Sequence, residues 1–233
     1  MDLFHSINRR KSCRKYDMKS LNEEQLLEIR EVIKEFDILN NTAFNYRLET
    51  KIKGKFLVEA PHYLIISGKG EPGELENIGF LFEHLILWFD EHDIGSVWLG
   101  SATGIEENKN DIIGIAFGYS TESVHREENQ FKRKKLKEIT NAPDDPYMKA
   151  ILYAPSGMNL QPWYFEKSDD HVLVYKQKLK LPFSKIYKLT DLDMGIALCH
   201  YQIASKKFNK EFHFERKEDN FSKKGYVLFG EIK

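Results

Sequence analysis

A basic segment near the amino terminus carries groups that could hold a phosphate. Residues 9–16 read Arg-Arg-Lys-Ser-Cys-Arg-Lys-Tyr, which places five cations and a serine hydroxyl close together. Guanidinium groups bind phosphate through paired hydrogen bonds, and Ser12 adds a hydroxyl donor or acceptor. Taken alone, however, such a run is more often a solvated basic terminus, so the phosphate interpretation needs a second motif.

Residues 153–163 form the most unusual segment, Tyr-Ala-Pro-Ser-Gly-Met-Asn-Leu-Gln-Pro-Trp. Two prolines and a glycine predict a sharp loop, and Ser156, Asn159 and Gln161 bring hydrogen-bonding groups to it. Trp163 then opens a strand. This composition suits a loop that holds a flat polar heterocycle by its edge, and a plain turn is the open alternative.

Three other patterns are weaker. Residues 68–73 fit G-x-G-x-x-G, but a dinucleotide site needs a helix that opens at the glycines, and Pro72 intervenes, so a flexible turn is favoured. Cys199 and His200 are neighbours on a predicted helix and point about 100° apart, which favours a buried thiol over a nucleophile and base. His84 and His92 lack the spacing of zinc ligands.

Composition and charge exclude several classes of protein. The 233 residues carry a formal net charge of -1, so no global field favours nucleic acid or an anionic membrane. Two cysteines, Cys13 and Cys199, make no disulfide framework. The first 14 residues do not form a secretory signal, and no stretch approaches the roughly 18 apolar residues of a membrane span. We expect a cytoplasmic protein without metal, nucleic-acid or membrane partners.

Apolar spacing predicts the elements that must position these motifs. Helices are expected over 21–38, 77–93, 146–152 and 193–207, and strands over 63–66, 96–99, 113–117, 171–176 and 225–229. The polar stretch 122–130 is the predicted linker.

The two sides of that linker resemble each other. Residues 61–64 match 162–165, residues 77–79 match 193–195 with a histidine five residues further on in each, and residues 116–118 match 228–230. Because the offsets are similar and the order is kept, an internal repeat is favoured over chance. We predict two halves, residues 1–121 and 122–233.

Together, these motifs resemble the nitroreductase family. Residues 7–14 resemble its opening I-x-x-R-R-S-x-R, and residues 154–163 closely resemble its A-P-S-x-x-N-x-Q-P-W loop. Residues 83–100 resemble its long central helix and the strand after it, and residues 117–119 and 132–135 resemble its later strand and basic residues. The resemblance implies an α/β (α+β) fold with mixed or antiparallel sheets.

The order of the motifs departs from the family. Ordinary members place the A-P-S loop in the first quarter of the chain, where residues 40–45 stand here, and they are homodimers with two flavin sites across the interface. This chain resembles both subunits fused into an intramolecular pseudo-dimer. The resemblance implies one complete flavin site per chain, a degenerate second site and no need for a homodimer; a stable dimer in sedimentation would count against this.

The resemblance also assigns residues to the flavin. Arg10, Lys11, Ser12 and Arg14 would hold the phosphate, the ribityl chain and the pyrimidine edge, with further phosphate contacts from Lys132, Arg133, Lys134 and Lys135. The ring would be lined by Pro155, Ser156, Gly157, Asn159 and Gln161, and the backbone of Leu99 and Gly100 would approach its reactive nitrogen.

The implied activity is that of an FMN-dependent NAD(P)H oxidoreductase. NADH or NADPH would reduce the flavin and leave, and a small-molecule acceptor such as a nitroaromatic or quinone would follow in a ping-pong cycle. A flavin carries its own redox chemistry, so no catalytic side chain is needed. A non-catalytic flavin-binding protein and a cofactor-free interaction protein are the alternatives.

Overall fold

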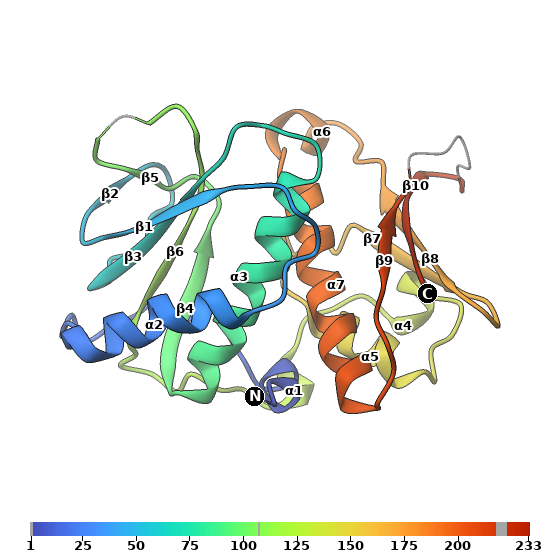
Figure 1. The fold of residues 1–233 in the computed structure, drawn as a ribbon, viewed down its shortest axis with the longest axis horizontal. Coiled ribbons are helices and arrows are strands. Elements are labelled where there is room, and N and C mark those ends of the chain that lie inside the picture. Colours follow the sequence, from blue (N-terminus) through green and yellow to red (C-terminus); the bar gives the residue numbers. More distant parts are fainter. Residues whose placement is uncertain (1, 107, 218–222) are drawn as a thin grey trace.

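Two long helices cross at the centre of the molecule and separate two antiparallel sheets (Figure 1). The computed structural model describes residues 2–106, 108–217 and 223–233. Helix α3 (Glu74–Glu91) and helix α7 (Thr190–Lys207) are buried on nearly all sides, as expected of helices at the centre of a core. No helix in the described ranges is both long enough and apolar enough to cross a membrane.

The first sheet has the strand order β1-β3-β6-β4. Its strands are β1 (Asn45–Glu49), β3 (His62–Ser67), β6 (Asp111–Tyr119) and β4 (Ile94–Leu99). Every residue of β3 is buried, which explains its continuous apolar run. Helix α2 (Glu23–Glu35) precedes the sheet, and Asn22 caps it through a reciprocal pair of hydrogen bonds with Gln25.

The second sheet has the strand order β7-β8-β10-β9. Its strands are β7 (Trp163–Lys167), β8 (Val172–Gln177), β10 (Tyr226–Ile232) and β9 (Phe214–Arg216). Helix α5 (Pro146–Tyr153) precedes β7. It begins with a proline, and Asp145 caps it by accepting a hydrogen bond from the Tyr147 amide.

Short elements complete the described part of the chain: α1 (Phe4–Ile7), β2 (Ile52–Lys53), β5 (Thr103–Gly104), α4 (Leu136–Ile139), α6 (Phe183–Ile186) and the 3₁₀ turns Glu128–Gln130 and Gly157–Asn159. Strands β2 and β5 pair with each other and form a separate two-stranded ribbon.

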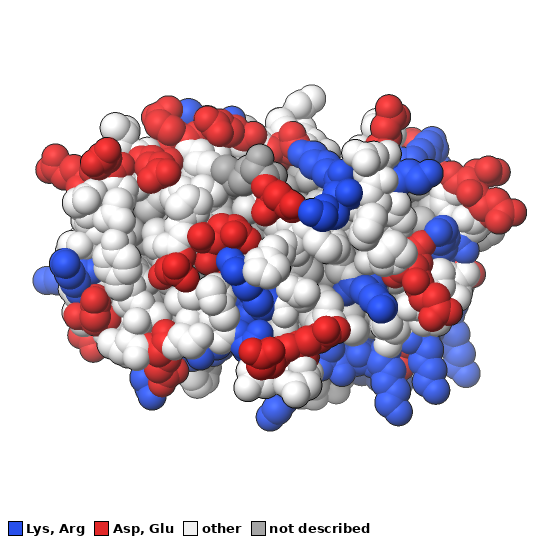
Figure 2. Space-filling model, turned by 90° about the horizontal axis from the view of Figure 1, so that it is seen from below, with Lys and Arg blue, Asp and Glu red and all other residues white. Residues whose placement is uncertain are grey.

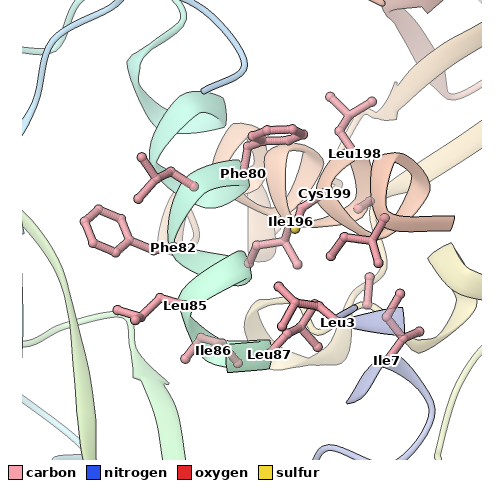
Figure 3. Close-up of a cluster of buried hydrophobic side chains, with 14 of the residues drawn as sticks. Leu3, Ile7, Phe80, Phe82, Leu85, Ile86, Leu87, Ile196, Leu198 and Cys199 are labelled. Carbon is pink, nitrogen blue, oxygen red and sulfur yellow. The ribbon is translucent and has the colours of Figure 1, made fainter. Parts of the chain in front are cut away.

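One hydrophobic core joins both halves across the crossing of α3 and α7. In Figure 3, Ile196 and Cys199 of α7 face α3, whereas Phe82 and Leu85 point from α3 toward the first sheet. Leu3 and Ile7 approach the same core from α1. The amino-terminal segment is therefore anchored beside the central helices, which fixes where the basic residues that follow it can lie.

Two glycines allow the central helices to approach closely. A β-carbon at Gly79 of α3 would lie 2.9 Å from the carbonyl carbon of Leu192, and one at Gly195 of α7 would lie 2.7 Å from the carbonyl carbon of Glu76. Both distances are well below van der Waals contact between carbon atoms. The sequence match of residues 77–79 with 193–195 thus falls on two positions that make the same contact from opposite sides.

The order of elements corrects a different one of the sequence matches, that of residues 61–64 with 162–165. In each sheet the second strand leads into a central helix, so β3 corresponds to β8, and β7 corresponds to β1. The predicted match of residues 61–64 with 162–165 therefore joins strands that do not occupy the same place. This correspondence of elements is the geometry that an internal repeat would produce; the repeat and its boundary at residue 121 stay predictions.

Candidate functional site

The basic amino-terminal segment is held as an extended strand between β4 and the linker. The Cys13 amide donates to the Ser96 carbonyl at 3.0 Å, and the Lys11 amide donates to the Val124 carbonyl at 3.2 Å. On the linker side, the Arg126 amide donates to the Arg9 carbonyl at 2.8 Å. These main-chain contacts bring the predicted linker beside the predicted phosphate-binding segment.

Arg10 turns inward from this strand and lies against α3. It is only 3% exposed, and its Nε lies 3.9 Å from Glu83 Oε1 and has no hydrogen-bond partner among the described residues. Glu83 is fully buried, accepts from Trp98 Nε1 at 3.0 Å and lies 3.1 Å from His200 Nε2. The guanidinium group therefore retains an unused donor in a buried position.

Two further arginines lie near Arg10, and we call Arg10, Arg126 and Arg133 the arginine cluster. Burial and then repulsion from Arg10 lower the pKa of Arg126 to about 10. The same causes, with added repulsion from Arg126, lower the pKa of Arg133 to about 9. Arg126 stacks on Phe131 at 3.5 Å from the ring centroid, with Arg133 at 5.4 Å from the same centroid. Three like charges held together favour an anion as their ligand.

The unusual loop, residues 154–162, is fastened to the segment that carries Arg133. Arg133 Nη1 donates to Asn159 Oδ1 at 2.9 Å, and Asn159 Nδ2 donates to the Lys132 carbonyl at 2.8 Å. The Lys134 amide donates to Gln161 Oε1, and Lys134 Nζ donates to the Gln161 carbonyl, both at 2.8 Å. The loop and the arginine cluster are thus parts of one hydrogen-bonded structure.

The backbone of this loop is strained. Met158, Asn159 and Gln161 have φ values of 50°, 56° and 45°, in the left-handed region that side chains other than glycine rarely adopt. Ser156 Oγ accepts from the Gln161 amide at 2.8 Å and closes the loop. Strain of this kind persists only where surrounding contacts impose it, and it is concentrated at functional sites.

Gly157 connects the loop to the start of α7. Its amide donates to Asp193 Oδ1 at 2.9 Å, and a β-carbon at this position would overlap the Tyr187 ring. The Tyr187 hydroxyl also donates to Asp193 Oδ1 at 2.9 Å. Burial raises the pKa of Asp193 to about 8, so this carboxyl is mostly protonated at neutral pH.

At the end of β4, only backbone atoms of Leu99 and Gly100 are placed to make the predicted flavin contact. The Leu99 side chain packs into a second hydrophobic cluster that includes Cys13 and Tyr16. Gly100 is exposed, and a β-carbon on it would lie 3.7 Å from Leu189 Cδ1, at the start of α7. The backbone of residues 99–100 therefore lies next to the segment that covers Gly157.

The predicted site residues fall into two groups. The structure brings Arg10, Arg133, Lys134 and the loop residues 155–161 into one region. Three other predicted basic residues, Lys132, Lys135 and Arg14, are exposed to solvent. Among the described residues, the Arg14 guanidinium hydrogen-bonds only to the Ser12 carbonyl. Lys11 and Ser12 are half-buried on the amino-terminal strand.

Sequence reasoning did not identify Arg126, Glu83 or Asp193. Arg126 stands in the charged linker, and the main-chain pairing with Arg9, together with the bond from its Nε to the Arg10 carbonyl at 3.1 Å, brings it to the site. Glu83 and Asp193 lie in the two long helices among apolar residues. A buried acid within an apolar helix was the one signal that could have indicated them.

The patterns set aside at the sequence level have structural roles. The G-x-G-x-x-G turn wraps around Glu74, whose carboxylate accepts from the amides of Lys69, Gly70 and Glu71 at 2.6–3.0 Å. The flexible turn that we expected is therefore tied to the first residue of α3, which begins three residues before the expected start at residue 77.

Cys199 is fully buried, as expected, and burial raises the pKa of its thiol. The nearest histidine to its Sγ is His84, at 3.3 Å from Nδ1, while His200 contacts Glu83 and the Ala150 carbonyl. No group of three or more potential metal ligands occurs in the described part of the chain.

Surface charge is mixed rather than of one sign. Seen from the side of α1, lysine and arginine side chains gather at the lower right of the view, and acidic side chains are spread over much of the remaining surface (Figure 2). The buried Arg10 contributes to the arginine cluster without contributing to this surface. The positive charge that matters for the site is therefore local, as the net charge of -1 requires.

Comparisons with known proteins identify the family and the fold of the chain. The family model described as "Putative TM nitroreductase" matches residues 2–205. A solved structure from Thermotoga maritima, described as a "putative nitroreductase", aligns over 100% of this chain and 93% of its own, with 17% sequence identity and a TM-score of 0.72.

Shorter nitroreductases align with part of the chain. A nitroreductase family protein from Clostridium difficile 630 covers 59% of this chain and 96% of its own, with 16% identity and a TM-score of 0.47. An "FMN-dependent Nitroreductase" from Clostridium difficile R20291 covers 55% of this chain and 93% of its own, with 16% identity and a TM-score of 0.41. A comparison with curated protein sequences finds no match. Since the family model spans most of the chain, the protein belongs to this family of nitroreductases, which are oxidoreductases.

Proposed function

We propose that the chain is an FMN-dependent NAD(P)H oxidoreductase of the nitroreductase type. The observation that carries the proposal is the bond between Arg133 and Asn159, which joins the arginine cluster to a loop suited to a flat heterocycle. FMN has this combination of groups, a phosphate at one end and a ring at the other.

The arginine cluster fits a phosphate. The Nε atoms of Arg10 and Arg133 are buried and have no hydrogen-bond partner among the described residues. Glu83 attracts Arg133 and so offsets part of the repulsion that Arg133 receives from Arg10 and Arg126. A phosphate monoester carries about -1.5 to -2 charges at neutral pH, so its binding would relieve the remaining repulsion and satisfy both donors.

The other residues of the site would orient the ring. Pro155 and Ser156 would line it, while Asn159 and Gln161 would hold the loop in place through their bonds to residues 132–134. Bound FMN would supply the hydride transfer between NAD(P)H and a small oxidised acceptor such as a nitroaromatic or quinone. Arg10 and Arg133 would neutralise the phosphate, and the strained loop would present a preformed surface to the ring.

One flavin per chain is part of the proposal. The corresponding place in the other half, beside the start of α3 and the loop before β1, is a cavity of about 520 Å³. Its lining includes three acidic residues, Glu71, Glu76 and Asp191, and one basic residue, Arg216, which is paired with Glu76, whereas the arginine cluster does not line it. Carboxylates disfavour a phosphate ligand, so we expect this second place to take no FMN and one chain to suffice for the complete site.

The first test is the visible absorbance spectrum of the purified protein, with the released flavin identified and counted. One FMN per chain, bleached rapidly by NADH or NADPH, is the expected result. A flavin that NAD(P)H does not bleach would favour a non-catalytic flavin-binding protein. A colourless protein that takes up no added FMN would favour a cofactor-free interaction protein.

A variant tests the phosphate contact. Arg133→Gln should weaken FMN binding about tenfold to a hundredfold, since a hydrogen bond to a charged group contributes about 1.5–3 kcal/mol. Riboflavin, which lacks the phosphate, should lose clearly less affinity than FMN, because it feels only the loss of the bonds from Arg133 to Asn159 and to the Tyr153 carbonyl. The control is Arg30→Gln, which removes an exposed arginine from the outer face of α2. Equal losses for FMN and riboflavin would refute the assignment of Arg133 to the phosphate.

A further inference from the structure

Asp193 and Asn77 occupy the same position on the two central helices. Each is the fourth residue of its helix, α7 and α3, and each is 1% exposed. Each reaches toward the loop that joins the preceding helix to the first strand of its sheet. A comparison of the two therefore shows what is particular to the half that carries the unusual loop.

Asn77 is fully engaged by its loop. Its Oδ1 accepts from the Leu39 amide at 2.9 Å and from the Asn40 amide at 3.4 Å, and its Nδ2 donates to the Thr42 carbonyl at 2.9 Å. Both polar atoms of the side chain thus serve to hold the loop. This is the arrangement expected of a purely structural side chain.

Asp193 is only half engaged. Its Oδ1 accepts from the Gly157 amide and the Tyr187 hydroxyl, but its Oδ2 is buried and has no hydrogen-bond partner among the described residues. A buried polar atom without a partner is destabilising, and a polar group of a bound ligand would supply the partner that Oδ2 lacks. The loop beside it is the one proposed above to line the flavin ring.

We propose that Asp193 contacts the ligand of this loop: its Oδ2, protonated, donates a hydrogen bond to a carbonyl oxygen or ring nitrogen of the bound heterocycle. The proposal rests on the proposed flavin site and adds to it a residue outside the loop motif. It also gives the two helices different roles, since Asn77 holds its loop whereas Asp193 holds both loop and ligand.

The surroundings of Asp193 support a protonated carboxyl. Burial raises its pKa to about 8, and the negative charge of Asp191 on the same helix acts in the same direction. Asp191 is itself paired with Lys176 of β8 and lies 3.9 Å from Arg216 of β9. On the other side, the Tyr187 hydroxyl and the Gly157 amide favour the ionised form, and burial raises the pKa of Tyr187 far above the range of the test.

The proposal predicts a definite dependence on pH. A ligand that accepts a hydrogen bond from Oδ2 binds only the protein in which Asp193 is protonated. The affinity for riboflavin should therefore be constant well below about pH 8 and fall about tenfold for each pH unit above it. Riboflavin is the probe, because it has no phosphate and its binding therefore does not depend on the charge of the arginine cluster. Its dissociation constant would be measured by fluorescence quenching between about pH 6.5 and about pH 9, together with the visible spectrum of the saturated complex.

Variants distinguish a direct contact of Asp193 with the ligand from a purely structural role in holding the loop. Asp193→Asn keeps a donor that never ionises, so riboflavin binding and the bound spectrum should become independent of pH over this range. Tyr187→Phe removes a hydrogen bond to the carboxylate and should move the wild-type midpoint to higher pH. Asp191→Asn, which removes a neighbouring carboxyl without this contact, is the control: it should retain the pH dependence, with the midpoint moved to lower pH because the charge of Asp191 raises the pKa of Asp193. The melting temperature of each ligand-free variant confirms that it is folded.

Each outcome decides a different point. A wild-type riboflavin affinity that stays constant across the range overturns the role of Asp193, and this result needs no variant to fold. A pH dependence that Asp193→Asn retains overturns it as well. If neither riboflavin nor FMN binds the wild-type protein at any pH, the proposed flavin site itself fails and the inference fails with it.

Discussion

Replacing Gly79 by alanine would force apart the two helices that form the centre of the molecule. The new β-carbon would lie 2.9 Å from the Leu192 carbonyl carbon and 3.2 Å from the Ile196 amide nitrogen, both backbone atoms that cannot rotate away. The Leu192 carbonyl oxygen would lie closer still to the new β-carbon, so the helices would have to separate by roughly 1 Å or more to restore ordinary van der Waals contact.

Two opposing effects set the change in the free energy of unfolding of the Gly79→Ala protein. Overpacking of a core typically costs about 1–3 kcal/mol, while alanine is about 1 kcal/mol more favourable than glycine within a helix. Because the contact is with backbone, we expect the upper part of the first range and a net loss of about 1–2 kcal/mol in the free energy of unfolding. Gly195→Ala, whose β-carbon would lie 2.7 Å from the Glu76 carbonyl carbon, should behave alike.

Urea unfolding followed by circular dichroism measures the effect. A single separation of the helices accommodates both β-carbons, so the double variant should lose less stability than the sum of the two single losses. Gly100→Ala is the matched control, since its β-carbon would make an ordinary 3.7 Å contact, and it should lie within about 0.5 kcal/mol of wild type. A Gly79→Ala protein that is more stable than wild type by about 1 kcal/mol, as helix propensity alone predicts, would refute the close crossing.

Two further predictions concern carboxylates outside the site. Glu74→Gln should lower the free energy of unfolding by about 1–3 kcal/mol, because it removes the charge that strengthens the bonds from the turn amides and puts an NH₂ group in place of one of the two accepting oxygens. Thermal unfolding measures the loss, with exposed Glu71→Gln as the control, and a melting temperature equal to that of the wild type would be the contrary result. Asp111 pairs with Arg47, chiefly through its hydrogen bonds, which hold the pKa of the carboxyl at about 2. Its contribution, about 1–2 kcal/mol after allowance for the partial exposure of Arg47, should be complete above about pH 4 and be lost as the pH falls toward 2. An Arg47→Gln protein whose stability follows pH as the wild type does between about pH 5 and about pH 2 would contradict this.

Elements with strong local signals were predictable from the sequence, and edge strands were not. The apolar runs of α3 and β3 predicted those elements close to their observed bounds, and apolar spacing also predicted α2. By contrast, β1 is half-buried and carries Arg47 and Glu49, and β9 has three residues, so neither has a clear apolar pattern. Their pairing with β3 and β10 comes from tertiary contacts.

The candidate site also contains residues that sequence motifs indicate and residues that only long-range contacts bring into place. Arg10 and the loop that holds Asn159 stand in motifs, and the sequence was sufficient to select them. The position of Arg126 depends on pairing between the linker and the amino-terminal strand, a contact across more than 100 residues that no local pattern reports. Which of the four basic residues 132–135 turns inward was also open, and burial together with the bond to Asn159 favours Arg133.

The crossing of α3 and α7 within one chain has a consequence for how such a protein can change. In a homodimer, a substitution on a central helix appears on both sides of the symmetry axis, so each side must tolerate it. Here Glu83 and Cys199 stand at matching positions, and each contacts a histidine of the opposite helix. One gene therefore specifies the two contacts separately, and a mutation can adapt one side of the interface while leaving the other as it was.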